Sequence, residues 1–463
     1  MPLIKSISGM RGTLGGSVGT SLTPVDITHV TAAFGSHICH QTSPKRMILG
    51  RDARPSGPLI SQLVSATLQA LGIQVIDLGL STTPTVAMAI RHAQAQGGIV
   101  ISASHNPADW NALKLFNQAG EYIEAATAEA IFATTVVQPA YVFANTQALG
   151  TYVATPEYVD MHIERILALP LVDPARIAQQ KFFVAVDGIN SGGGIFVPKL
   201  LKALGVAHST VLNDEPTGLF THDPEPLPAH LTTLASTVRQ GAYDLGIAVD
   251  PDVDRLAIVD ENGEAWGEEY TLVAVADYVL RHTPGNTVSN LASTDALGAL
   301  AAQCGAQHTT SAVGERHVVD TMRATQAVIG GEGSGGVIYP ALHYNRDALV
   351  GIALLLTHLA SLQCPASELR AQLPAYYMLK HKLDISPDLD VSGLFDEIRD
   401  VYKAYPIDTR DGVKVRLPEG WLLLRKSNTE PVLRLFVEAT TMAHVQDMMR
   451  QALQDIQKLT ARH

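Results

Sequence analysis

Cysteine is scarce in this sequence, whose 463 residues include only Cys39, Cys304 and Cys364. These three residues lie far apart and form no CxxC pair, so we expect neither a disulfide framework nor a zinc site. We predict ordinary buried thiols of a reducing compartment.

Long hydrophobic runs are missing as well. The longest apolar stretch, 349–356, has 8 residues, whereas a membrane-spanning helix needs about 20. The N-terminal segment contains a lysine, but the apolar region of a secretory signal peptide does not follow it. We therefore predict a cytoplasmic protein with no membrane partner.

Charged residues make up only 17% of the chain, and those of positive sign are the minority. Lys and Arg total 33 against 45 for Asp and Glu, which gives a net charge of −12. A general nucleic-acid binder needs a concentrated basic surface, so this class is excluded. A small anionic substrate is not excluded, because it responds only to the local charge of its site.

The chain is rich in hydrophobic residues (46%) and in glycine (37 residues), as expected of a globular protein with a substantial core. Its length suggests about three domains at roughly 150 residues each. Short apolar runs alternate with segments of helical periodicity, which is typical of βαβ units around a mostly parallel sheet. The expected strands of the first part are 46–50, 73–79 and 98–104, with helices over 59–71 and 83–95.

The same strand–turn–helix pattern begins again near residue 181 and near residue 286, so we predict three related α/β modules. The pattern then changes. Strand-like segments at 414–428 and 431–439 precede an amphipathic segment at 443–459, which predicts a smaller α+β domain with an antiparallel sheet. The predicted fold is therefore α/β with four domains, at 1–150, 151–257, 258–370 and 371–463.

Three carboxylates alternate in the segment Val-Asp-Pro-Asp-Val-Asp-Arg at 249–255, namely Asp250, Asp252 and Asp254. Carboxylates this close repel one another unless a cation lies between them, and oxygen ligands suit Mg²⁺. A calcium EF-hand loop is disfavoured because Arg255 stands where that loop needs glycine. The alternative is a solvated acidic turn.

Three further segments offer polar groups after a strand-like run. In 101–107 (Ile-Ser-Ala-Ser-His-Asn-Pro), a serine hydroxyl could act as a nucleophile or phosphate carrier, although an ordinary polar turn fits too. The segment 425–431 (Arg-Lys-Ser-Asn-Thr-Glu-Pro) has the components of a phosphate cradle or of a polar hairpin turn. The segment 330–336 (Gly-Gly-Glu-Gly-Ser-Gly-Gly) allows close backbone approach, but it also suits a flexible turn.

The ordered set of four segments resembles the α-D-phosphohexomutases, over essentially the whole chain. The resemblance implies a heart-shaped, four-domain architecture with one motif of each domain facing a central cleft. It implies a phosphoserine at Ser104, beside His105, and Mg²⁺ held by Asp250, Asp252 and Asp254 together with a phosphoserine oxygen.

The other implied site residues bind the sugar phosphate or stabilise its transfer. Glu332 and Ser334 would bind sugar hydroxyls. The remaining residues implied for catalysis or for substrate and phosphate binding are Arg11, Lys114, Arg255, Arg316, Arg425, Ser427, Asn428, Thr429 and Arg434. The implied reaction interconverts hexose 6-phosphate and hexose 1-phosphate through a hexose 1,6-bisphosphate, which is both intermediate and activator.

The sequence departs from the family pattern at two positions. Gly336 ends the sugar loop where many bacterial members have histidine, and Arg316 replaces a common lysine. A general acid or base at either position is therefore in doubt, and Arg316 and His317 are the candidates.

The opening segment and the sugar loop look closest to archaeal-type phosphoglucosamine mutases. We thus expect glucosamine 6-phosphate as substrate, ahead of the phosphomannomutase and phosphoglucomutase alternatives. A non-catalytic sugar-phosphate-binding protein is the alternative of another class. A homodimer is left open.

Overall fold

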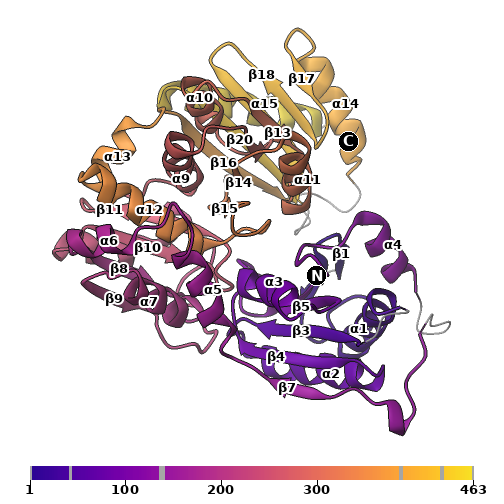
Figure 1. Ribbon diagram of the computed structural model, residues 1–463. Helices are drawn as coiled ribbons and strands as arrows, with labels where there is room; N and C mark the ends of the chain where they lie inside the picture. The colour runs from indigo at the N-terminus through magenta and orange to yellow at the C-terminus, as the bar shows by residue number, and fades with distance from the viewer. Residues whose placement is uncertain (1–2, 41–43, 135–140, 385–388, 428–431, 461–463) are drawn as a thin grey trace.

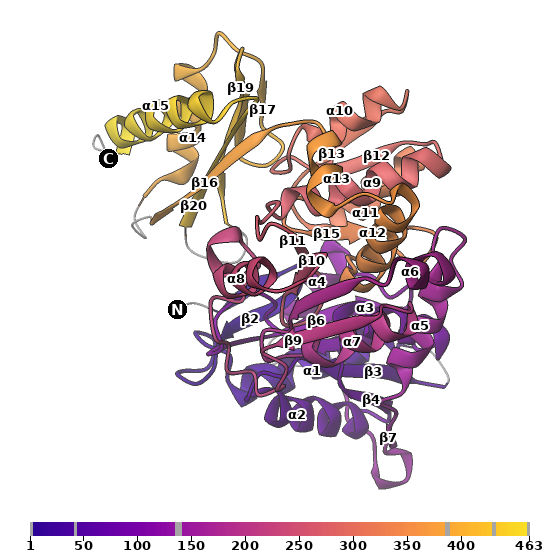
Figure 2. The same ribbon diagram turned by 90° about the vertical axis from the view of Figure 1, so that its left-hand side faces the viewer.

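The structure is a computed structural model that describes residues 3–40, 44–134, 141–384, 389–427 and 432–460. Four β-sheets follow one another along the chain, and we name the parts built around them domains I to IV (Figures 1 and 2).

Domain I has a seven-stranded sheet in the order β1-β2-β6-β5-β3-β4-β7. Its strands are β1 (Ile4–Ser6), β2 (Gly9–Thr13), β3 (Arg46–Arg51), β4 (Gln74–Leu80), β5 (Gly97–Ile101), β6 (Trp110–Asn117) and β7 (Tyr152–Ala154). Its helices are α1 (Pro24–Ile38), α2 (Gly57–Ala70), α3 (Thr83–His92) and α4 (Ala125–Ala133), with a 3₁₀ turn at Thr146–Ala148. Strands β3, β4 and β5 are parallel, and β6 runs antiparallel to β5.

Domain II has a four-stranded sheet in the order β11-β10-β8-β9. Its strands are β8 (Phe183–Asp187), β9 (His208–Leu212), β10 (Leu245–Val249) and β11 (Leu256–Asp260). Its helices are α5 (Tyr158–Leu167), α6 (Pro174–Gln180), α7 (Gly193–Ala203) and α8 (Thr232–Gln240), with a 3₁₀ turn at Pro228–His230.

Domain III repeats this arrangement in the order β13-β12-β14-β15. Its strands are β12 (Thr287–Asn290), β13 (His308–Ser311), β14 (Ile329–Glu332) and β15 (Gly336–Ile338). Its helices are α9 (Glu269–His282), α10 (Ala296–Gln303), α11 (Glu315–Thr325), α12 (Ala348–Leu362) and α13 (Ala366–Gln372).

The three sheets share one topology, as the sequence predicts for three related modules. In each, a central strand (β3, β8 or β12) lies between two parallel neighbours, and the later neighbour (β5, β10 or β14) turns back into an antiparallel strand. The connection at that reversal is the serine loop in domain I, the aspartate loop in domain II and the glycine-rich loop in domain III. Equivalent places in three modules thus carry the three motifs.

Domain IV has a fully antiparallel sheet in the order β16-β20-β19-β18-β17, which confirms the predicted α+β domain. Its strands are β16 (Tyr377–Asp384), β17 (Ile407–Asp408), β18 (Val413–Arg416), β19 (Gly420–Lys426) and β20 (Val432–Ala439). Its helices are α14 (Val391–Val401) and α15 (Met442–Thr460), which buries an apolar stripe including Val445 and Ile456 on the sheet.

Domains II and III share one continuous hydrophobic core, whereas domain IV has its own. Helix α12 lies inside the shared core and is apolar on all sides, so nearly every one of its residues is buried. The Asp347 side chain begins this helix by accepting hydrogen bonds from the backbone N–H groups of Leu349 and Val350. No single helix of the described residues has the length and apolar character to cross a membrane, although α12 and α13 together, bent by 91°, pass on length and composition.

Three details differ from the sequence-based expectations. Strand β7 pairs with β4 beyond the expected boundary at 150, and β11 extends past the expected boundary at 257. Cys39 is buried, but Cys304 is exposed, so the expectation that all cysteines are buried was wrong. Cys304 directly follows the last turn of α10, where its side chain leaves the core.

Trp421 packs between domains III and IV. Its ring contacts a cluster that includes Leu291 of domain III and Phe436, and its indole N–H donates to Glu438 at 2.8 Å.

Trp421→Ala is expected to lower the free energy of unfolding by about 3–5 kcal/mol, because removal of a fully buried indole leaves a cavity. Differential scanning calorimetry measures the effect. The exposed Tyr405 is the control, since Tyr405→Ala should change stability by less than about 0.5 kcal/mol; equal effects of the two variants would contradict this packing.

Candidate active site

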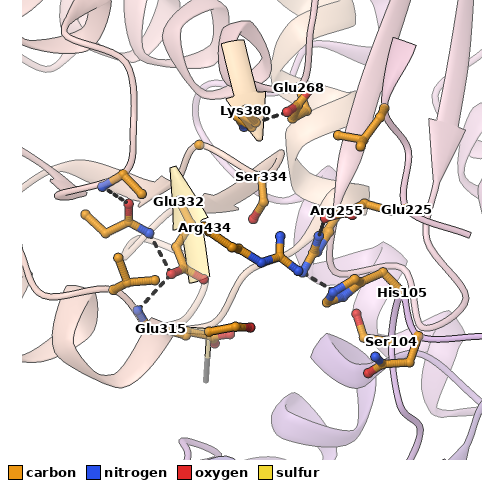
Figure 3. Close-up of a pocket in the computed structure, with 18 of the residues that line it drawn as sticks. Ser104, His105, Glu225, Arg255, Glu268, Glu315, Glu332, Ser334, Lys380 and Arg434 are labelled. Atoms are coloured by element: carbon orange, nitrogen blue, oxygen red, sulfur yellow. Dashed lines mark hydrogen bonds and ion pairs between the residues drawn. The ribbon is translucent and has the colours of Figure 1, made fainter. Parts of the chain in front are cut away.

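All four domains contribute to one pocket of about 530 Å³. The predicted site residues that line it are Arg11, Ser104, His105, Lys114, Arg255, Glu332, Ser334, Arg425, Ser427 and Arg434. Figure 3 shows how Ser104 and His105 lie across the pocket from Ser334 and Glu332. The four motifs are therefore brought together from positions more than 300 residues apart in the chain.

Ser104 lies just beyond the end of β5 in a left-handed backbone conformation, with φ = 51°. A non-glycine residue adopts this conformation only when its surroundings hold it there. The backbone N–H of Ser104 donates to Ser102 Oγ at 2.9 Å, and Ser102 Oγ donates to Asp52 at 2.6 Å. The buried carboxylate of Asp52 thus holds the serine loop in place through Ser102.

Arg54 holds the same loop by donating hydrogen bonds to its backbone carbonyl groups. This fully buried guanidinium pairs with Asp52 at 3.0 Å and donates to the backbone carbonyls of Ser104 and Asn106, each at 2.6 Å. Arg11 adds a hydrogen bond to the Asn106 side chain at 2.6 Å. The position of the serine hydroxyl therefore depends on two arginines that hold its loop.

The aspartate loop lies directly against this serine. Ser104 Oγ donates to Asp250 Oδ2 at 2.6 Å, and the other oxygen of Asp250 accepts from the backbone N–H groups of Asp254 and Arg255. Val253 in the same loop has φ = 61°, so this second loop is also held in a strained conformation. Strain at both loops is typical of a functional site.

The charge of the aspartate loop is partly neutralised by buried cations. Lys114 Nζ lies 2.5 Å from Asp252 and 3.2 Å from Asp254, and Arg346 lies 2.7 Å from Asp254. Burial and the neighbouring carboxylates raise the pKa of Asp250 well above its usual range. Burial alone would also raise the pKa of Asp254, but Arg346 and Lys114 outweigh it and hold that pKa below its usual value.

The loop fits a divalent metal ion. Asp250, Asp252 and Asp254 each offer an oxygen, and these oxygens lie within 4.8 Å of one another. In the described part of the chain, Asp252 Oδ1 and Asp254 Oδ1 are buried without a hydrogen-bond partner. A buried carboxylate oxygen without a partner is costly, and a hard cation such as Mg²⁺ would satisfy it.

His105 is neutral in this pocket. Burial, and after it the charges of Arg255 and Arg11, lower the pKa of His105 well below 6.5. Arg255 donates to His105 Nδ1 at 2.8 Å and pairs with Glu225 at 3.1 Å (Figure 3). His105 can therefore act as a hydrogen-bonding group, but it adds no positive charge.

Glu332 is the last residue of β14, and Ser334 lies in the glycine-rich loop that leads from β14 to β15. One oxygen of Glu332 accepts hydrogen bonds from Asn290 Nδ2 at 2.8 Å and from the Gly314 backbone N–H at 3.0 Å. A Cβ at position 333 would lie 1.9 Å from a Glu269 oxygen, so a larger residue there would displace the Glu269 carboxylate. The loop places its carboxylate and hydroxyl at the pocket wall.

The domain IV end of the pocket is basic. Arg425 and Arg434 are register partners on β19 and β20, and Arg425 pairs with Asp411 at 3.2 Å. Ser427 continues from β19, and its backbone N–H donates to Val432. Asn428 and Thr429, which the sequence also places here, lie outside the described residues.

Arg316 lies at the start of α11. Among the described residues it is not part of the pocket lining, and its guanidinium binds the Tyr122 carbonyl at 3.1 Å and Asp320 at 2.9 Å. His317 is exposed on α11 and does not belong to the described lining either. The roles expected of these two residues in proton or phosphoryl transfer stay predictions, and the contact with Tyr122 joins domain III to domain I.

Models of the phosphoglucomutase/phosphomannomutase domains match the chain four times in succession, as α/β/α domain I (residues 4–141), α/β/α domain II (156–263), α/β/α domain III (267–377) and the C-terminal domain (388–454). The chain belongs to the phosphoglucomutase/phosphomannomutase family. Members of this family are named as mutases, which are isomerases, and the chain is therefore an isomerase as well.

Individual relatives can be aligned with this chain over nearly its whole length. A phosphoglucomutase/phosphomannomutase of Thermococcus kodakarensis is 33% identical over 434 residues, covering 92% of this chain and 94% of the relative. A protein of Methanopyrus kandleri named "Probable phosphoglucosamine mutase" is 31% identical, covering 93% of each chain. The crystal structure of a family member from Burkholderia thailandensis superposes with a TM-score of 0.83 at 27% identity, covering 98% of this chain and 97% of that one.

Several pocket residues were not identified from the sequence. Tyr122, Glu315 and Arg346 line the pocket, and burial raises the pKa of Glu315 to about 7. Lys380 of β16 also lines it and pairs with Glu268 at 2.6 Å and Glu269 at 2.7 Å across domains III and IV (Figure 3). In the sequence, the one indication of a further site residue was Arg346, a charged residue that stands next to Asp347 just before a long apolar segment.

Mg²⁺ binding to the aspartate loop is testable without a substrate. At a free Mg²⁺ concentration of 100 times the dissociation constant, the free energy of unfolding should rise by about 2.7 kcal/mol, because only the folded loop binds the ion. Calorimetric melting with and without Mg²⁺ measures this, and Asp252→Asn should remove most of the increase. Glu264→Gln, an exposed substitution in the same domain, should keep it; an increase that survives in Asp252→Asn would place the ion elsewhere.

Proposed function

We propose that this protein interconverts hexose 6-phosphate and hexose 1-phosphate through a phosphoserine at Ser104. The observation that carries the proposal is the contact of Ser104 Oγ with Asp250 at 2.6 Å, at the wall of a pocket shared by the Glu332 and Arg425 loops. This arrangement supports Ser104 as a phosphate carrier beside carboxylates suited to a metal, with groups for sugar hydroxyls and a basic end for a second phosphate.

In the first transfer, the bond between Ser104 Oγ and phosphorus breaks, and the C1 hydroxyl oxygen of hexose 6-phosphate forms a new bond to that phosphorus. The C1 hydroxyl loses its proton in this step, and Ser104 Oγ gains one and becomes a free hydroxyl again. The product is hexose 1,6-bisphosphate. After the intermediate has turned over in the pocket, its 6-phosphoryl group returns to Ser104 Oγ, and hexose 1-phosphate leaves. The bisphosphate is therefore the intermediate and can also rephosphorylate a serine that has lost its group.

The residues of the chain supply binding, orientation and charge. Arg425, Ser427 and Arg434 hold the phosphate that does not react, while Lys114 and Arg11 stabilise charge on the transferring group. Asp250, Asp252 and Asp254 would hold Mg²⁺, which neutralises charge on phosphoryl oxygens when bound. The pocket lies between four domains, and shielding of the phosphoserine from bulk water there would protect it from hydrolysis.

Glucosamine 6-phosphate is the substrate that we favour, with mannose and glucose phosphates as the second candidates. The Methanopyrus relative carries the phosphoglucosamine mutase name, whereas the Thermococcus relative is named for the other two activities. The predicted cytoplasmic location and a homodimer stay predictions.

The proposal is tested by assaying isomerisation of all three sugar phosphates with Mg²⁺ and a trace of glucose 1,6-bisphosphate. We expect turnover, fastest with glucosamine 6-phosphate, and a loss of about 10³-fold or more in kcat for Ser104→Ala, which lacks the phosphate carrier. Ser102→Ala is the structural comparison, since it loosens the loop but keeps the hydroxyl of Ser104. Binding of sugar phosphate with no turnover would favour the non-catalytic sugar-phosphate-binding protein, and turnover of glucose or mannose phosphates alone would overturn the glucosamine preference.

A further inference from the structure

Arg346 contacts three carboxylates that belong to different parts of the site. Its guanidinium lies 2.7 Å from Asp254 of the aspartate loop, 2.8 Å from Glu332 of the glycine-rich loop and 3.0 Å from Glu315 at the start of α11. The side chain is 10% exposed, so these contacts are shielded from solvent. A planar guanidinium with five N–H donors can serve three partners, which the point charge of a lysine cannot do in the same way.

The two oxygens of Glu332 have separate partners. Oε1 is held by Asn290 and by the Gly314 backbone, whereas Oε2 is held by Arg346. The same guanidinium binds Asp254 Oδ2, whereas Asp254 Oδ1 is buried with no hydrogen bond in the described chain and has only a 4.0 Å ion-pair contact with Arg255 Nε. Arg346 therefore sets the orientation of a proposed sugar ligand and of a proposed metal ligand at once.

Space for this arginine is provided by Gly336. A Cβ at position 336 would lie 2.2 Å from Arg346 Cδ and 2.8 Å from its Cγ. These atoms belong to the part of the side chain that carries the guanidinium to its three partners. Any side chain at 336 would force Arg346 to move, so the last glycine of the sugar loop and Arg346 form one structural unit.

We propose that Arg346 is a positioning residue that links the metal ligand Asp254 to the sugar ligand Glu332, and that Gly336 is required for this role. The proposal deepens the proposed phosphohexomutase function and rests on it for the sugar. It also assigns a reason to the glycine at 336, where a side chain would displace the linking arginine.

Two substitutions at Arg346 separate positioning from general structural support. Arg346→Lys and Arg346→Ala should lower kcat/KM by about 10²-fold, because Glu332 and Asp254 lose their common partner. Isothermal titration of the Mg²⁺-free protein should show tighter Mg²⁺ binding in Arg346→Ala, since a cation that competes for Asp254 has been removed. Arg323→Gln, which removes a half-exposed pair with Glu121 outside the pocket, is the control that leaves both quantities unchanged.

The role of Gly336 is tested by a double-mutant cycle. Gly336→Ala should lower kcat/KM in the wild-type background but cause little further loss in Arg346→Ala, which lacks the Cδ and Cγ atoms at 2.2 and 2.8 Å and keeps only the Cβ atom at 3.3 Å. Additive losses would overturn the link between the two residues. Weaker Mg²⁺ binding in Arg346→Ala, together with a melting temperature lowered in both Arg346 variants, would show a merely structural role.

The two proposals fail in different ways. If the wild-type protein turns over none of the three sugar phosphates, the proposed function fails, while the Mg²⁺ titration still decides whether Arg346 competes for Asp254. If the wild type is active and Arg346→Ala keeps full kcat/KM with unchanged Mg²⁺ affinity, the positioning proposal alone is overturned.

Discussion

Three buried aspartates on one short loop are the constraint on which the rest of the site depends. Asp250, Asp252 and Asp254 are each fully shielded from solvent, and carboxylates this close cannot all stay ionised without cations nearby. Domain I supplies Lys114 and domain III supplies Arg346, so the loop of domain II is completed by its neighbours on both sides. The convergence of the domains is thus a requirement of charge neutralisation as well as of substrate binding.

This requirement also explains how an acidic protein can hold a phosphate. The net charge of −12 describes the whole chain, but the pocket gathers Arg11, Lys114, Arg255, Arg425 and Arg434 from separate domains. A metal on the aspartate loop would change the sign of the charge beside Ser104. Composition alone describes the whole chain, and only the fold shows that basic residues distant in sequence meet at the pocket.

Much of the fold and of the site could be predicted from the sequence, because each strand, helix and motif is encoded by residues that are close together in the chain. Strand-like runs ending in polar loops revealed three modules, and the structure places three motifs at the same strand reversal of each. Arg54 and Arg346 were missed because each is a single residue whose partners are distant in sequence, such as Ser104 for one and Glu332 for the other. The contact of Arg316 with Tyr122 could not be predicted for a related reason, since its position along the chain does not reveal which side of α11 faces domain I.

The central claim is that Ser104 carries the phosphoryl group that the protein transfers. The most direct measurement is rapid-quench transfer from protein labelled with ³²P by prior incubation with labelled glucose 1,6-bisphosphate. Peptide mapping should locate the label on Ser104, and mixing with unlabelled hexose 6-phosphate and Mg²⁺ should move it into hexose bisphosphate within one turnover. Label on another residue, or label that stays on the protein while product forms, would contradict the account.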